Sequence, residues 1–111
     1  MIYAAIAFFS LAAILGMLLL SYVLRDKETP KGIVFTHGPL AAIGIVLLIV
    51  YALGNTPSPV ESIVLFIIAA AGGTILVWHD VKRKPIPKWL AVTHGLIAVT
   101  AFVFLLYFAF K

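Results

Sequence analysis

The chain has 111 residues, of which 64% are hydrophobic and 11% are charged, and its formal net charge is +4. Soluble domains are roughly half apolar, so this composition predicts a membrane protein without room for a separate soluble domain. The absence of cysteine excludes disulfides, thiolate metal sites and thiol catalysis. The few charges lie almost entirely in the predicted loops, and no basic face is left that could bind nucleic acid.

Four apolar segments follow one another, and each predicts a transmembrane helix. The first, residues 2–24, contains no charged residue and is longer than the ~20 residues that cross a bilayer. We expect it to be retained, because no basic residue precedes it and the apolar run is too long for a signal peptide. The other three helices are predicted at residues 30–53, 59–81 and 87–110. A spanning chain must satisfy its backbone internally, and four short spans cannot close a barrel.

Prolines mark the predicted helix starts, since proline is tolerated at the first helical position. Thr29 is the expected N-cap of the second helix, and Ser58 with Glu61 has the pattern of a capping box at the third. Pro39 lies inside the second helix and lacks an N–H, so we expect a kink or a local break near Phe35.

The basic residues predict the orientation in an inner or plasma membrane. Seven of the eight basic residues flank the same helix ends, and only Lys111 lies at the other side. These seven are Arg25, Lys27, Lys31, Lys82, Arg83, Lys84 and Lys88. Such a bias places both basic loops in the cytoplasm and both termini outside.

An internal repeat with an offset of 57 residues organises the chain. Thr36-His37-Gly38 corresponds to Thr93-His94-Gly95, and Gly16 corresponds to Gly73. A repeat of this kind predicts a single domain, residues 1–111, made of two tandem helical hairpins at about 2–53 and 59–110. We expect an all-α membrane protein with an up-down-up-down bundle, in which the second and fourth helices are diagonal and parallel.

The repeat places one histidine just inside each of these two helices. His37 and His94 would then face each other across the bundle axis at equal depth, and His79 ends the third helix on the same side. Neutral imidazoles that face each other across a gap are a natural axial pair for a haem iron. Thr36, Thr93 or the Phe35 carbonyl are the candidates to accept the second ring N–H. Neighbouring small residues would either leave room for a macrocycle or let the helices pack closely.

This arrangement resembles integral-membrane b-type cytochromes, such as the cytochrome b561 group and the quinol-oxidising cytochromes b. The resemblance is carried by the diagonal histidines and by four glycines that would lie beside the macrocycle, namely Gly16, Gly38, Gly73 and Gly95. It implies haem b with its iron on His37 and His94, and electron transfer or haem handling rather than an enzyme activity. It also implies a quinone or a redox protein as partner. The basic charge suits acidic membrane lipid, and we expect a homo-oligomer, because four short helices make a thin bundle around a large cofactor.

The chain departs from those families in one respect. They usually carry two histidines on each ligand helix and hold one haem in each leaflet, whereas no histidine lies in the outer half here. The resemblance therefore implies a haem on the cytoplasmic side only. His79 could bind a second haem, contact a propionate or ligate iron across an oligomer interface. Its repeat partner Tyr22 could supply an axial or supporting oxygen.

Two other functions stay open. The length suits a small oligomeric transporter of the multidrug type, but that family depends on a glutamate in the first helix, which is absent here. A structural or assembly subunit without a cofactor would use the histidines and glycines only for packing. We interpret Asp80 as a solvated helix end and Glu61 as a cap. Lys31, Lys88 or Arg83 could pair with haem propionates.

Overall fold

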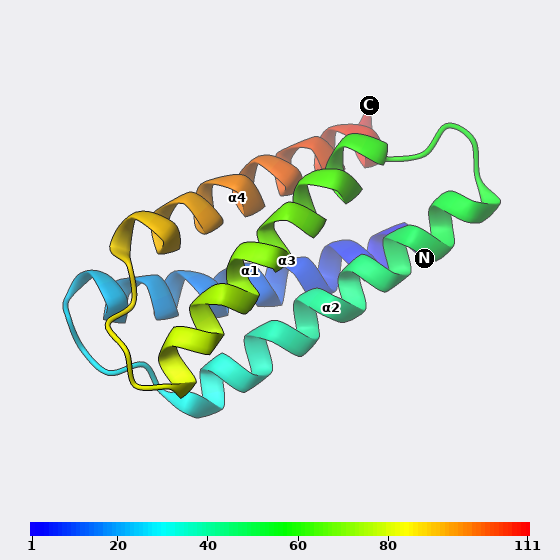
Figure 1. Cartoon of the computed structure of the whole chain (residues 1–111). Helices are drawn as coiled ribbons and strands as arrows, with labels where there is room; N and C mark the ends of the chain where they lie inside the picture. The colour runs from blue at the N-terminus through cyan, green and yellow to red at the C-terminus, as the bar shows by residue number, and fades with distance from the viewer.

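The computed structural model describes all 111 residues and consists of four helices joined by three loops (Figure 1). The helices are α1 (Ile2–Leu24), α2 (Lys31–Gly54), α3 (Val60–Val81) and α4 (Lys88–Phe110). Each is long and apolar enough to cross a membrane. The all-α class is confirmed, and the predicted helix boundaries are correct to within one residue.

The predicted caps are wrong. The N-cap positions are the prolines Pro30, Pro59 and Pro87, and no side chain caps any helix start. Thr29 instead turns its hydroxyl to a carboxylate of another helix. Ser58 and Glu61 form no capping box, because Pro59 occupies the N-cap position between them.

Of the kink or local break predicted near Phe35, the break does not occur. α2 runs as one helix from Lys31 to Gly54 with Pro39 inside it. Membrane helices tolerate an internal proline because neighbouring groups can satisfy the carbonyl that it frees.

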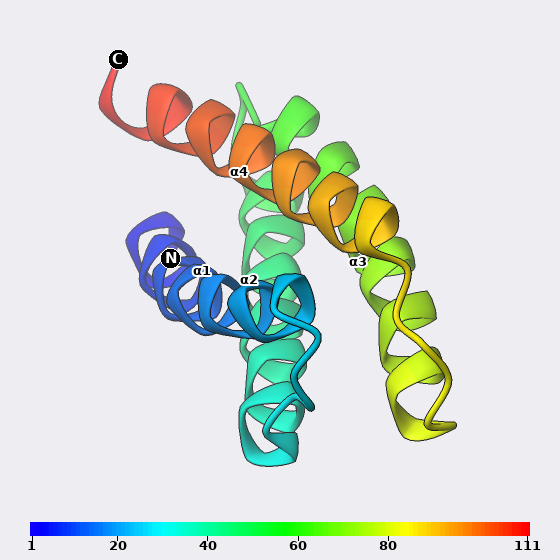
Figure 2. The ribbon, with the colours of Figure 1, turned by 90° about the vertical axis from the view of Figure 1, so that its left-hand side faces the viewer.

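Each helix packs against two of the other three. α1 pairs with α2 and α3 with α4 to form two hairpins, while α1 also contacts α4 and α2 contacts α3. The diagonal pairs are therefore α1 with α3 and α2 with α4. Figure 1 shows loops 25–30 and 82–87 at one end, here called the basic end, and both termini at the other, here called the terminal end. Figure 2 views the molecule from the basic end.

The packed core lies in the terminal half of the bundle. It consists of seven buried residues, Ile2, Ala5, Phe9, Leu48, Phe66, Ala101 and Leu105. Phe9 and Phe66 stack across the α1–α3 diagonal with parallel rings whose centroids are 3.8 Å apart. A Cβ at Gly44 would lie 2.8 Å from the Phe9 ring, so the glycine makes room for a phenyl group.

The half toward the basic end buries much less. α1 beyond Ala12 and α3 beyond Ala69 contain no buried residue. In α2 before Gly44 and in α4 before Ala101, only Val34 and Ala91 are buried. Because close packing is a main source of helix association in membranes, side-chain contacts hold the helices less firmly in this half.

The phenyl stack makes a prediction about stability. Phe9→Ala or Phe66→Ala should lower the free energy of unfolding by roughly 3–5 kcal/mol, since a large buried side chain leaves a cavity. Phe104→Ala is the matched control, because this ring is 44% exposed on the outer surface of α4. Denaturation in detergent micelles measures the free energy of unfolding of each core variant and of the control. Equal losses at Phe9 and Phe104 would contradict a core centred on the stack.

Candidate functional site

His37 of α2 and His94 of α4 meet across the second diagonal of the bundle. Their ring centroids are 6.3 Å apart and their planes are inclined by 80°. Nδ1 of His37 lies 2.8 Å from the carbonyl oxygen of Ala12 in α1. Nδ1 of His94 lies 2.7 Å from the carbonyl oxygen of Ala69 in α3. Each histidine is thus tied to the first helix of its own hairpin.

These hydrogen bonds define which ring nitrogen carries the proton. A carbonyl oxygen only accepts, so each Nδ1 donates, and Nε2 of the neutral ring is left as an unprotonated acceptor. Neither Nε2 has a hydrogen-bond partner, yet no buried side-chain nitrogen or oxygen in the protein is unpaired. Both Nε2 atoms therefore keep some accessible surface. The site presents two free imidazole lone pairs inside an apolar bundle.

Gly16 and Gly73 leave the space that the two imidazole rings occupy. A Cβ at Gly16 would lie 2.9 Å from Cε1 of His37, and one at Gly73 would lie 3.0 Å from Cε1 of His94. Each glycine is four residues after the alanine whose carbonyl accepts the hydrogen bond, and residues four apart share a helix face. The acceptor and the space for the ring therefore come from the same face.

The four predicted glycines divide into two kinds. Gly16 and Gly73 contact the imidazoles directly, whereas a Cβ at Gly38 or Gly95 would meet no atom within 4 Å. The latter two, although next to the histidines in the sequence, leave open space around them.

His79 and Tyr22 lie apart from the histidine pair. Each is ten residues beyond the alanine that anchors a histidine, which is about 15 Å of helix. Nδ1 of His79 lies 2.9 Å from the carbonyl of Ile75 in its own helix, and the Arg25 guanidinium lies over the Tyr22 ring. No three His, Cys, Asp or Glu side chains cluster so that they could hold a metal ion. His79 is therefore not a third ligand at the pair.

Sequence reasoning missed the acceptors Ala12 and Ala69. The Thr36 and Thr93 hydroxyls, which it offered instead, donate to carbonyls of their own helices, and the Phe35 carbonyl is not the partner of His37. The available signal was a small residue followed by glycine four positions later, repeated at an offset of 57 residues.

Asp80 is not the solvated helix end that the sequence suggested. Its side chain is 11% exposed and lies 2.7 Å from Nζ of Lys31. Lys88 pairs with the exposed Asp26 at 3.1 Å. Of the three basic residues expected to pair with propionates, Lys31 and Lys88 are thus paired with carboxylates of the protein, and Arg83 is not.

No protein-family model, curated protein or solved structure matches this chain.

The glycine contacts make a second prediction. Gly16→Ala and Gly73→Ala should destabilise the protein by about 1–3 kcal/mol, because the new methyl group would push an imidazole from its place. Gly38→Ala and Gly95→Ala are matched controls that should be neutral or stabilise the helix by about 0.5–1 kcal/mol. Thermal unfolding in detergent compares all four variants. A loss at Gly38 as large as that at Gly16 would contradict the assigned contacts.

Proposed function

We propose that this chain is an integral-membrane haem b-binding protein, with His37 and His94 as the two axial ligands of one iron. The observation that carries the proposal is the pair of Nε2 lone pairs on rings whose centroids are 6.3 Å apart. Two imidazoles that bind one metal ion at about 2.0–2.1 Å from each nitrogen have centroids roughly 6 Å apart. The rings of Trp78 and His79, which are also near-perpendicular, have centroids only 5.1 Å apart. The His37 and His94 rings are therefore farther apart than this pair.

The number of ligands favours haem over a bare metal ion. Structural zinc sites use four protein ligands and catalytic ones use three, but no third ligand joins His37 and His94. A porphyrin brings four nitrogens of its own, so two axial histidines complete the coordination of its iron.

The loosely packed half of the bundle also supports the proposal. The histidines lie next to Ala12 and Ala69, where burial in α1 and α3 ends. A flat apolar macrocycle in this half would supply contacts that the side chains do not make. Its carboxylates would be favoured at the basic end, where five basic residues have no carboxylate partner, namely Arg25, Lys27, Lys82, Arg83 and Lys84.

Haem would supply one-electron chemistry, and the chain would bind the haem and orient its ligands. The Ala12 and Ala69 carbonyls orient the imidazoles, as partners of metal-bound histidines generally do. The Phe9–Phe66 stack belongs to the buried core on the terminal side of the histidines. No acid pair or nucleophile accompanies the histidines, so we propose electron transfer or haem handling, with a quinone or redox protein as partner.

The topology of the bundle, its internal repeat and its orientation in the membrane are part of the same proposal. We infer an up-down-up-down bundle of two tandem hairpins, with the basic loops cytoplasmic and the termini outside. The inference is supported by features that recur 57 residues apart, such as the two histidine–alanine bonds and the left-handed residues Asp26 and Arg83, both with φ 56°. Homo-oligomerisation stays a prediction.

The test is an absorption spectrum of the protein with haemin added, first oxidised and then reduced with dithionite. We expect a sharp Soret band, reduced α and β bands, and one haem per chain. His37→Ala or His94→Ala should weaken haem binding about a hundredfold or more, because even the supporting partners of metal ligands contribute 10–100-fold.

His79→Ala is the matched control and should retain the spectrum. A protein that stays colourless with haemin, or that loses its spectrum only in His79→Ala, would contradict the proposal. A colourless protein would leave the histidines as groups that tie the helices together.

A further inference from the structure

The two hairpins are joined differently at the two ends of the bundle. At the terminal end they share the buried core around Phe9 and Phe66. Toward the basic end that core is absent, although the histidine pair needs a defined spacing between the hairpins. A polar cluster takes the place of the core there.

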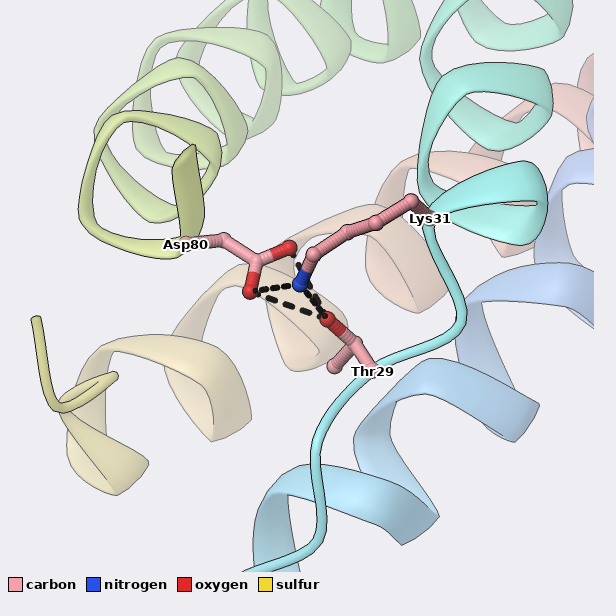
Figure 3. A network of polar contacts seen from close by, with 3 residues as sticks. All are labelled: Thr29, Lys31 and Asp80. Atoms are coloured by element: carbon pink, nitrogen blue, oxygen red, sulfur yellow. Dashed lines mark hydrogen bonds and ion pairs between the residues drawn. The ribbon is translucent and has the colours of Figure 1, made fainter. Parts of the chain in front are cut away.

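The cluster consists of Asp80 at the end of α3, Lys31 at the start of α2 and Thr29 in the loop before it (Figure 3). The Thr29 hydroxyl lies 2.9 and 2.8 Å from the two Asp80 carboxylate oxygens. Nζ of Lys31 lies 2.7 Å from one of these oxygens and 3.1 Å from the Thr29 hydroxyl. Thr29 is buried and the Asp80 side chain is 11% exposed, so this carboxylate is largely shielded from solvent.

The second ion pair between the hairpins is a weaker link. The two lysines are similarly exposed, Lys88 at 50% and Lys31 at 42%, but Asp26 is 79% exposed whereas Asp80 is 11% exposed. An exposed carboxylate contributes little to an ion pair because water screens it. The Asp80 cluster is therefore the main polar connection between the hairpins at the basic end.

The cluster also lies on the path that sets the histidine spacing. His37 belongs to α2, six residues or about 9 Å of helix beyond Lys31. His94 belongs to α4, but it bonds to the carbonyl of Ala69 and packs on Gly73, both in α3. The distance between α2 and α3 is thus one of the two interhelical distances that set the spacing of the rings, and the distance between α1 and α4 is the other.

We propose that Asp80, with Thr29 and Lys31, is a positioning clamp that holds α2 against α3 and keeps His37 and His94 at ligating distance. Its purpose rests on the proposed haem function, but its effect on the helices can be measured without haem. Asp80 touches neither ring in this role and acts only through the helices.

The test uses spin labels on the full chain in lipid nanodiscs without haem. Phe35→Cys and Val92→Cys place one label on α2 and one on α4, each two residues before a histidine. Both side chains are exposed, and the chain has no other cysteine. We expect Asp80→Asn to broaden the distance distribution between the labels, and Asp26→Asn, the matched control, to leave it unchanged. An unchanged distribution in Asp80→Asn, or equal broadening in both variants, would overturn the clamp.

A charge swap distinguishes loss of the clamp from general misfolding. Lys31→Asp combined with Asp80→Lys should restore the narrow distribution that Asp80→Lys alone broadens, because the pair is re-formed in a geometry that suits both helix dipoles. Failure of the swap to restore it would count against the clamp.

Haem release then connects the clamp to the site. Asp80→Asn should release haem about tenfold faster than Asp26→Asn, because the shielded carboxylate of Asp80 loses its charge whereas that of Asp26 is exposed. Equal release rates would overturn the link to the histidines. If the chain binds no haem while Asp80→Asn still broadens the distribution, the proposed function fails and the clamp stands.

Discussion

The two hydrogen bonds from His37 and His94 to the Ala12 and Ala69 carbonyls are the constraint on which the rest of the structure depends. A polar ring among membrane helices is costly unless it has a partner, and a helical carbonyl can accept a second bond. For a helical carbonyl to accept this bond, the imidazole must approach the helix backbone closely, and Gly16 and Gly73 make that approach possible. Each hydrogen bond also joins the two helices of its hairpin and leaves the Nε2 atom of the histidine free.

The bundle is divided at the level of these bonds. Toward the termini, Phe9 and Phe66 stack inside a closely packed core. Toward the basic loops, few side chains are buried, and Asp80 with Thr29 and Lys31 connects the hairpins instead. The terminal half contains most of the buried side chains, and the histidines lie at the boundary between the two halves.

Much of this arrangement could be predicted from the sequence, because segment length and proline position determine where membrane helices start and end. The 57-residue offset also indicated that His37 and His94 belong together. The acceptors could not be predicted, since Ala12 and Ala69 look like ordinary packing residues and offer only backbone. Asp80 was misjudged because a carboxylate at a helix end is usually solvated, and only the folded chain brings Thr29 and Lys31 to it.

The most direct test of the central claim is an electron paramagnetic resonance spectrum of the ferric, haem-loaded protein. Ligation by both histidines predicts a low-spin signal, and rings inclined by 80° predict the strongly anisotropic type that near-perpendicular axial imidazoles produce. The signal should disappear in His37→Ala and in His94→Ala. A high-spin signal from the unaltered protein, or a low-spin signal that survives both substitutions, would contradict the account.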